Sequence, residues 1–418
     1  MKKYNYILVT LISFFFLVLS CKEEIELETE TFESVLVVEA TITNELKPHE
    51  VKVSRTYLLE ESEQAIENNA EVRVIDNTGN SFNFSQNSEG IYVSDIAFEA
   101  LPDIEYTLEI NTTDGKTYNS NQQTLTPISQ IDNLYAEYVN DVNNDAGIEV
   151  YVDSENEDSG AQYFRYEYEE TYKLVAPNYI EFETLLTNYQ EAVTYTPRYD
   201  LKVYFVTQII PKTGEQEVCF KTQKNTNIIL GETSNLEQNN LNRFPVRFIK
   251  FDDGIIRERY SILVKQYVQS LEAYNYYKII ESLSNNESVL SQAQPGYVNG
   301  NINEVNNTNS KVIGFFEVTS ISEQRIFFNY FDFDLQQPDY PYTCDFYELD
   351  YNDNTANDLD RNDRQEIYRL LTEFEEYGFD HHITEIPEPI NGIWKIASPE
   401  CTDCRTVGSN IQPDFWVD

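Results

Sequence analysis

Residues 35–42 read VLVVEATI, a run rich in β-branched side chains that favours a β-strand. Apolar residues then recur at alternate positions, as in VKVSR at 51–55 and YTLEI at 106–110. The dipeptide Asp114-Gly115 is a strong hairpin signal. Short strands at about ten-residue spacing, each ended by Gly, Asn or Asp, predict an immunoglobulin-like β-sandwich over residues 35–127.

Residues 128–418 are predicted to form a larger, β-rich domain with two helices and a C-terminal CxxC pair, so the fold class is mainly β. The stretch YFRYEYE at 163–169 alternates aromatic and charged residues, which is typical of a strand with one packed face and one exposed face. Ser270 is a suitable N-cap for a first helix over 271–283. Capping-box spacing predicts a second helix over 363–378. Further strands are expected near 201–209, 227–230, 247–251 and 260–268.

Two aromatic patterns have a structural and a functional interpretation. The first helix carries an apolar stripe that we expect to face the core, formed by Leu271, Tyr274, Tyr277 and Ile280. A tyrosine ladder could pack across strands or, if it faced solvent, stack on sugars or peptides. We expect cross-strand packing for the ladder, which consists of Tyr163, Tyr166, Tyr168 and Tyr172.

The N-terminus has the parts of a lipoprotein signal peptide over residues 1–20. Lys2 and Lys3 precede an apolar run at 7–19, and about 13 residues are too few to span a bilayer as a helix. The sequence VLSC at 18–21 resembles a lipobox, which predicts lipidation at Cys21. An ordinary signal peptide with a chance cysteine is the alternative.

Residues 21–34 are predicted to be a lipidated acidic tether. Lys22, Glu23 and Glu24 resemble the export signal of Bacteroidota surface lipoproteins. The predicted location is therefore the outer membrane, anchored by lipid and facing the cell exterior. The alternative is a solvated tether without an export role.

Composition limits the partners. The chain has 72 acidic and 29 basic residues among 418, a formal net charge of -43. Such a charge argues against nucleic acid, which needs clustered Lys and Arg. An aromatic content of 14% argues against disorder and supplies apolar area for sizeable cores.

Four cysteines remain besides Cys21, and they are candidates for structural disulfides. Four cysteines allow three connectivities, between which the sequence does not choose. A zinc site, with help from His381-His382, and a redox CxxC are the alternatives, but neither has its usual sequence context. The four are Cys219, Cys344, Cys401 and Cys404.

No catalytic residues or metal site are predicted. The sequence has no nucleophile elbow, P-loop or HExxH motif, and with 72 acids a pair of carboxylates is uninformative. Asp141–Asp145 and Asp350–Asn354 have oxygen ligands at alternate positions, as calcium loops do. Ala146 and Thr355 stand where an EF-hand needs glycine, so Ca²⁺ is an open alternative to solvated turns and no cofactor is expected.

The order of many short segments resembles one family, the Bacteroidota lipoproteins grouped as domain of unknown function 4249. One departure is Gly408-Ser409, where members often carry two glycines. The segments are VVEA (37–40), VKVSR (51–55), NAEVRV (69–74), GIY (90–92), YTL (106–108), DGKTY (114–118), VC (218–219), SLEAY (270–274), QPGYVNGNI (294–302), GFF (314–316), CTDCR (401–405) and PDFW (413–416).

The resemblance implies a surface lipoprotein often encoded beside a TonB-dependent (SusC-like) outer-membrane channel, and no established activity. We therefore expect a non-catalytic accessory or ligand-capture partner of such a channel, with an unknown cargo. A structural or adhesive surface protein is the alternative. A glycan- or peptide-active hydrolase is a third reading, which no sequence motif supports.

Overall fold

The computed structural model describes residues 34–56, 65–140, 146–156, 160–185, 208–214, 217–284, 298–307, 310–344, 346–350, 382–385 and 393–417. Within these ranges the chain is mainly β, which confirms the predicted fold class. The first predicted helix is present as α2 (Leu271–Ser284). The second predicted helix, over 363–378, lies outside the described residues.

The N-terminal strands form one large sheet, whose order is β19-β8-β7-β4-β5-β6-β2-β1-β20. Each predicted strand from residue 35 to residue 110 is present, and the hairpin at Asp114-Gly115 joins β7 to β8. Two short strands, β3 and β9, pair with β2 and β7. The bounds are β1 (Leu36–Thr43), β2 (Glu50–Arg55), β3 (Ala65–Ile66), β4 (Glu71–Asp76), β5 (Ser81–Gln86), β6 (Tyr92–Ser94), β7 (Glu105–Asn111), β8 (Thr117–Ser120) and β9 (Gln123–Thr124).

Two strands of this sheet come from much later in the chain. β19 (Ile302–Glu304) pairs with β8, and β20 (Val312–Thr319) runs parallel to β1. The first sheet therefore contains strands from both sides of residue 127. A β-sandwich or barrel-like fold fits this unit, while the domain boundary after Pro127 stays a prediction.

The two end strands of the sheet are joined by one side chain. The Asn301 amide donates to the Phe316 carbonyl at 2.8 Å and accepts from the Phe316 N–H at 2.8 Å. Asn301 thus supplies both hydrogen bonds that a neighbouring strand would otherwise make. Alternating residues of the strands fill the interior, where Val74, Leu108 and Ile110 are fully buried.

Tyr106, at the start of β7, bonds to the backbone of the turn before that strand. Its side chain is buried, and its hydroxyl accepts a hydrogen bond from the Leu101 N–H at 2.9 Å. This bond to the backbone a few residues upstream is the arrangement of a tyrosine corner. It fixes the turn that leads into β7.

Two further sheets pack face to face. One has the order β10-β11-β17, and the other has the order β15-β12-β18-β21, with β16 also on β12. Side chains from both sheets, such as Val150, Phe164 and Ile262, form a shared core. The bounds are β10 (Asn133–Asn140), β11 (Ala146–Glu155), β12 (Tyr163–Val175), β15 (Val218–Lys224), β16 (Ile229–Glu232), β17 (Asn240–Lys250), β18 (Tyr260–Val268) and β21 (Ile321–Phe328).

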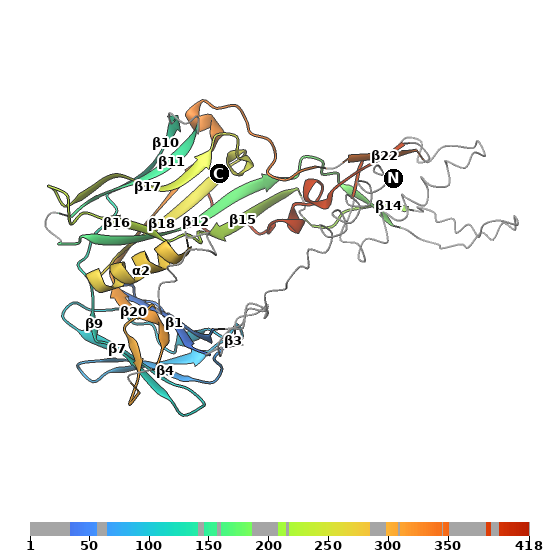
Figure 1. Ribbon diagram of the computed structural model, residues 1–418. Helices are drawn as coiled ribbons and strands as arrows, with labels where there is room; N and C mark the ends of the chain where they lie inside the picture. The colour runs from blue at the N-terminus through green and yellow to red at the C-terminus, as the bar shows by residue number, and fades with distance from the viewer. Residues whose placement is uncertain are drawn as a thin grey trace, which may run out of the picture.

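α2 lies between the first sheet and the sandwich (Figure 1). Ser270 caps it, since its hydroxyl accepts from the Ala273 N–H at 3.1 Å. Tyr276 packs on Phe315 of β20, with ring centroids 5.4 Å apart. Leu271, predicted to face the core, is 55% exposed, so the stripe prediction is wrong at that position. The prediction is confirmed at Tyr274, which is buried, and at Tyr277 and Ile280, which pack partly buried beside Ala273 and Tyr276.

The remaining elements are short. β13 pairs with β14, and β24 lies between β22 and β23. Of the strand predicted over 201–209, only its last two positions are described, and they belong to β14. The bounds are β13 (Phe182–Leu185), β14 (Gln208–Pro211), β22 (Phe346–Asp350), β23 (His382–Glu385), β24 (Ile393–Ala397) and the 3₁₀ helices η1 (Gly254–Ile256), η2 (Tyr330–Phe333), η3 (Pro399–Cys401) and η4 (Cys404–Thr406).

Candidate binding cleft between the first sheet and the sandwich

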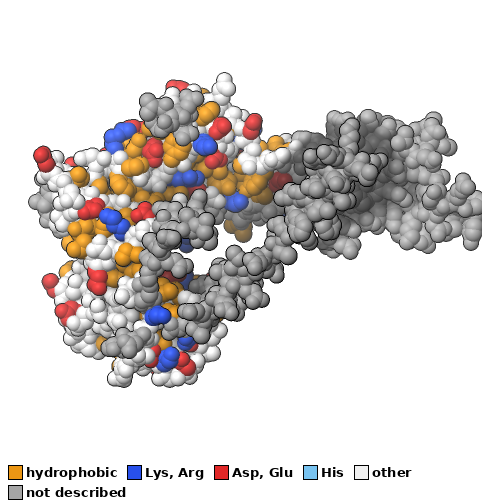
Figure 2. Space-filling model, in the orientation of Figure 1, with side chains coloured by type: hydrophobic (Ala, Val, Ile, Leu, Met, Phe, Trp, Pro, Cys, Tyr) orange, Lys and Arg blue, Asp and Glu red, His pale blue; other side chains and the backbone are white. Residues whose placement is uncertain are grey.

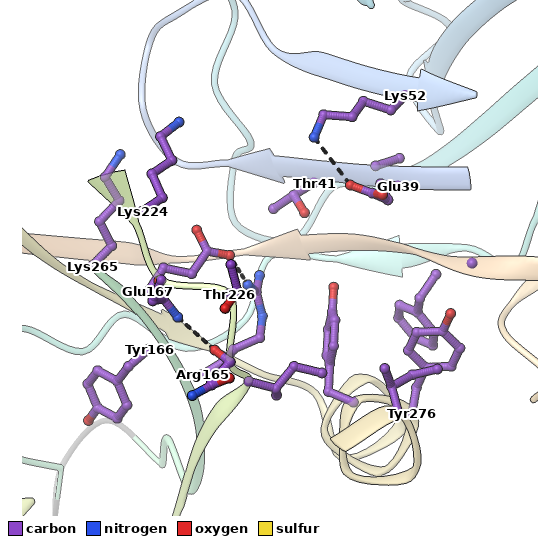
Figure 3. Close-up of a pocket in the computed structure, with 18 of the residues that line it drawn as sticks. Glu39, Thr41, Lys52, Arg165, Tyr166, Glu167, Lys224, Thr226, Lys265 and Tyr276 are labelled. Carbon is purple, nitrogen blue, oxygen red and sulfur yellow. Dashed lines mark hydrogen bonds and ion pairs between the residues drawn. The ribbon is translucent and has the colours of Figure 1, made fainter. Parts of the chain in front are cut away.

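An open cleft with a volume of about 600 Å³ lies where the first sheet, β12 and α2 meet (Figure 3). One wall comes from β1 and β20, at residues 37–41 and 313–315. The other comes from β12 at 165–169 and from the segment 224–228, which links β15 to β16. A cleft of this size suits a small ligand.

The charge of the lining differs from that of the chain. The chain has more than twice as many acidic as basic residues, whereas four basic and three acidic residues line the cleft. Figure 2 shows Lys and Arg side chains on both sides of the hollow between the two parts of the molecule. The basic residues are Lys52, Arg165, Lys224 and Lys265, and the acidic ones are Glu39, Glu167 and Glu169.

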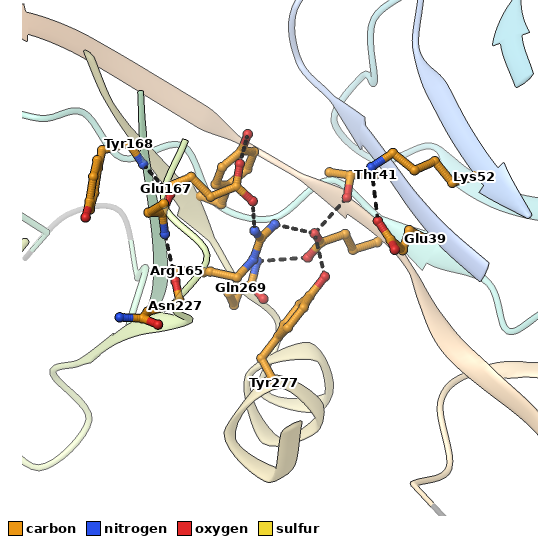
Figure 4. Close-up of polar contacts among 12 residues, drawn as sticks. Glu39, Thr41, Lys52, Arg165, Glu167, Tyr168, Asn227, Gln269 and Tyr277 are labelled. Atoms are coloured by element: carbon orange, nitrogen blue, oxygen red, sulfur yellow. Dashed lines mark hydrogen bonds and ion pairs between the residues drawn. The ribbon is translucent and has the colours of Figure 1, made fainter. Parts of the chain in front are cut away.

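A buried ion pair holds the base of the cleft together. Arg165 of β12 donates through Nη2 to Glu317 of β20 at 2.6 Å, and both side chains are less than a tenth exposed. The same carboxylate accepts from Thr41 at 2.9 Å, Tyr277 at 3.3 Å and Gln269 at 2.8 Å. Figure 4 shows these donors coming from β1, α2 and the sandwich. The network therefore joins the first sheet, the helix and the sandwich.

Arg165 is enclosed by rings as well as by charge. Its guanidinium lies 4.4 Å from the ring centre of Tyr267 and 4.7 Å from that of Tyr277. It also pairs with Glu167, which accepts from the Tyr267 hydroxyl at 3.2 Å. Burial lowers the pKa of Arg165, but the charges of Glu317 and Glu167 outweigh burial and raise the pKa above its ordinary value. Arg165 is therefore a permanent cation.

The two tyrosines beside Arg165 stay protonated. Burial, and then the charge of Glu317, raises the pKa of Tyr277. Burial, and then the charge of Glu167, raises the pKa of Tyr267. Both hydroxyls therefore remain hydrogen-bond donors to the carboxylates throughout the ordinary pH range.

The lysines of the cleft are held less tightly. Lys52 lies 3.4 Å from Glu39, and the two side chains are 56% and 64% exposed. Lys265 lies 3.8 Å from Glu323. Lys224 is exposed, and within the described part of the chain no carboxylate lies within ion-pair distance of it. Figure 3 shows Lys224 and Lys265 extending in the same direction from the second wall.

Asn225 positions the segment that carries Lys224. Its side-chain oxygen accepts from the Tyr168 N–H at 2.8 Å, and its own N–H donates to the Tyr168 carbonyl at 3.0 Å. Its amide nitrogen donates to the Asn227 carbonyl at 2.7 Å. The turn after β15 is thus fixed on β12, which also fixes the backbone position of Lys224.

A second ion pair, whose carboxylate is buried, lies inside the sandwich. Glu170 accepts from Arg247 at 3.0 Å, from the Tyr260 hydroxyl at 2.6 Å and from Gln223 at 2.6 Å. These residues come from four strands of the two packed sheets. Because the carboxylate is surrounded by donors from its own core, this cluster serves packing between the sheets.

The four cysteines form two disulfides. Cys219 bonds to Cys404, and Cys344 bonds to Cys401. The structure thus confirms disulfides and selects the connectivity that the sequence left open. The CxxC cysteines bond to partners elsewhere in the chain, so neither a zinc site nor a redox pair is formed at 401–404.

Several predicted sites fall on residues that the structure does not describe. Cys21, with the export signal Lys22, Glu23 and Glu24, lies there, as does the calcium candidate Asp141–Asp145. Of the second calcium candidate, Asp350–Asn354, only the backbone of Asp350 is described, at the end of β22. His381 is outside the described residues, and His382 begins β23.

The exposed face predicted for 163–169 is wrong at Arg165, which is only 7% exposed. The alternation placed it correctly opposite Phe164 and Tyr166, but Glu317 covers it from another sheet. A signal for Glu317 exists in the sequence, because it is the only charged residue in the apolar strand VIGFFEVT at 312–319. A lone acid in a buried strand needs a partner. The tyrosine ladder packs as expected at Tyr166 and Tyr172, which are 1% and 4% exposed.

No helix within the described ranges is long and apolar enough to cross a membrane. No curated protein matches the chain. A solved structure described as a membrane anchored protein from Corynebacterium diphtheriae aligns at 10% identity and a TM-score of 0.15, over 57% of this chain and 55% of its own. The chain thus spans about half the length of that protein, and so low a score carries no argument.

A family model described as "Domain of unknown function (DUF4249)" matches residues 22–325. The match covers the first sheet, α2, and Arg165 and Glu317 at the base of the cleft. The chain belongs to the DUF4249 family.

Proposed function

We propose that this protein is a lipid-anchored outer-membrane protein on the cell surface, of the Bacteroidota lipoprotein type. In this role it captures a ligand as a non-catalytic accessory of a TonB-dependent (SusC-like) channel. The observation that carries the capture role is the cleft of about 600 Å³, which is open to solvent and has a tightly bonded base.

The N-terminal sequence supports the anchored location. A lipoprotein cysteine carries several acyl chains, and two or more chains hold a protein firmly on a membrane. The segment from Cys21 to residue 34 could extend roughly 40 Å, since an extended chain gains about 3.3 Å per residue. A cleft tethered this way stays close to a neighbouring channel, which raises the local concentration of captured ligand.

The chemistry of Glu317 supports a non-catalytic role. Its carboxylate already accepts hydrogen bonds from Arg165, Thr41, Tyr277 and Gln269. A carboxylate used in this way has little capacity left to take a proton from a substrate. Glu317 thus serves to hold the walls of the cleft in place.

Gentle detergent extraction of the full-length protein, tagged after Asp418, tests the partnership. Mass spectrometry of the captured material is expected to identify a TonB-dependent barrel. A Cys21→Ser variant, which cannot be lipidated, is the matched control and should lose both the outer-membrane location and the barrel. Recovery of the bait alone from the lipidated protein would contradict the proposed partnership.

A further inference from the structure

We propose that the cleft binds an anionic ligand through Lys224 and Lys265, and that the recognised groups are carboxylate or sulfate oxygens. The inference rests on the proposed capture role and names its class of ligand. The source is either a free polycarboxylate or the acidic units of a saccharide, because both present the same oxygens.

Strand register brings the two lysines to one face of the sheet. Lys224 of β15 lies opposite Glu169 of β12, and Lys265 of β18 lies opposite Glu167 of β12. Residues directly opposite one another point to the same face of a sheet. Lys224, Lys265, Glu167 and Glu169 therefore share the face that lines the cleft, as does Arg165, two residues before Glu167.

The two carboxylates of β12 on that face are directed toward arginines. Glu167 pairs with Arg165 and accepts from the Tyr267 hydroxyl. Glu169 lies 3.6 Å from Arg325 of β21, on the opposite side of β12 from Lys224. The two β12 acids opposite the lysines are thus engaged elsewhere, and Glu323 of β21, which lies opposite Lys265 on its other side, makes only the 3.8 Å contact with Lys265.

The ammonium groups of both lysines are therefore available to contact a ligand. Lys224 has no acidic partner within the described ranges, and the contact of Lys265 with Glu323 is 3.8 Å long with both groups partly exposed. A pair of that kind is weak and is easily exchanged for a ligand. In a chain with a formal net charge of -43, two such cations in one cleft select for an anion.

The surrounding groups suit oxygen-rich anions of small size. Thr226 and Asn227 line the same wall and are exposed, so they can bond hydroxyl or carboxylate oxygens. Lysine acts as a compact point charge, which accepts carboxylate and sulfate in many orientations. The volume of about 600 Å³ accommodates a small ligand or a few units of an oligosaccharide.

Isothermal titration calorimetry on the purified full-length protein in neutral detergent tests the inference. The probes are citrate, trigalacturonate and the neutral trisaccharide maltotriose. We expect citrate or trigalacturonate to bind, and to bind more weakly as NaCl is raised, because exposed charges are screened. Binding of citrate alone identifies a free polycarboxylate, and binding of trigalacturonate identifies an acidic saccharide. Failure of both, or equal binding of maltotriose, would overturn the inference.

Charge-removing variants locate the site. Lys224→Gln combined with Lys265→Gln should weaken binding by about tenfold, the effect of losing about 1.4 kcal/mol. Lys224→Gln alone changes an exposed position and should give part of that loss of affinity. It is the variant to use if the double variant does not fold. Lys250→Gln removes the same charge from the exposed end of β17, outside the cleft lining, and should leave affinity within about twofold. Equal loss in the Lys250 variant would contradict a site in the cleft.

These measurements use the purified protein without a channel. Loss of barrel recovery with intact anion binding would refute the channel partnership and leave the cleft assignment standing. Barrel recovery without anion binding would refute the ligand class alone.

Discussion

Arg165 and Glu317 form an ion pair of 2.6 Å although 152 residues separate them in the chain. Arg165 belongs to the sandwich and Glu317 to the first sheet, so the pair joins the two walls of the cleft. Tyr277 of α2 adds a hydrogen bond to the same carboxylate. The pair therefore joins, within one buried network, all three elements that surround the cleft.

Glu317→Gln should destabilise the protein by about 3 kcal/mol, because it leaves the buried Arg165 without its main counter-charge. The glutamine has nearly the same shape, so the loss reports charge and hydrogen bonding instead of packing. The measurement is the midpoint of urea unfolding.

The exposed pair of Lys52 and Glu39 is the control for that experiment. Glu39→Gln should change the free energy of unfolding by no more than about 1 kcal/mol, since exposed ion pairs contribute little. Equal losses for Glu317→Gln and Glu39→Gln would show that burial of the Arg165 pair does not matter.

Gly314→Ala should separate β20 from β1. Gly314 has a φ of +141°, and a Cβ there would lie 2.1 Å from the carbonyl oxygen of Val38 on β1. A shift of backbone is required, and we expect a loss of about 3 kcal/mol in the free energy of unfolding. Gly231→Ala is the matched control, because its Cβ would meet only side-chain atoms at 3.4 Å. Hydrogen exchange should show faster exchange in β1 and β20 for the first variant alone.

His49 should make stability depend on pH between about 6.5 and 4. Burial lowers the pKa of His49 from 6.5 to about 4, against the opposing effect of its hydrogen bond to the Phe98 carbonyl at 2.8 Å. The unfolded chain therefore binds more protons in this window, and stability is complete above pH 6.5 and falls as the pH drops toward 4. The loss from this group is about 3 kcal/mol.

Urea unfolding of wild type and His49→Gln at several pH values isolates that contribution, because the carboxylates titrate in both proteins. Glutamine can still donate to the Phe98 carbonyl. The difference in unfolding free energy between the two proteins should change as the pH falls from 6.5 to 4. A constant difference would refute the assignment to His49.

Removal of the Cys219–Cys404 disulfide should cost about 4–5 kcal/mol, because the bond closes a loop with a sequence separation of 185. Removal of the Cys344–Cys401 bond, with a separation of 57, should cost about 1 kcal/mol less. Paired Cys→Ser variants and urea unfolding measure both losses. Peptide mapping without reductant checks the connectivity, and a peptide that links Cys401 to Cys404 would contradict it.

Local patterns predicted about half of the described strands, including most of those in the first sheet and β12, β17 and β18 of the sandwich. Alternation over 35–42, 72–76 and 106–110 is present as β1, β4 and β7, and the bounds of β18 match those expected. Ser270 was identified correctly as the cap of α2. These features depend on neighbours two to four residues apart, which is the range over which a side-chain pattern acts.

The cleft could not be predicted in this way. The sequence placed Arg165 on an exposed face. The alternation of side chains along β12 carries no information about another sheet that packs over that face. Glu317 had a visible signal as a lone acid in an apolar strand, but nothing local names its partner. The net charge of the chain also gave no hint of Lys224 and Lys265 meeting on one face, because β15 and β18 reach opposite sides of β12 only in the folded sheet.

The sequence by itself determined about half of the strands, the first helix, the presence of disulfides and, as a prediction, the lipid anchor at Cys21. Only the tertiary structure decided that β20 pairs with β1, that Cys219 bonds to Cys404 and that Arg165 meets Glu317. The physical reason is the range of the forces involved. Backbone preference and side-chain alternation act between near neighbours in the sequence. A buried charge or an unpaired strand edge needs a partner, and the whole fold decides which distant residue supplies it.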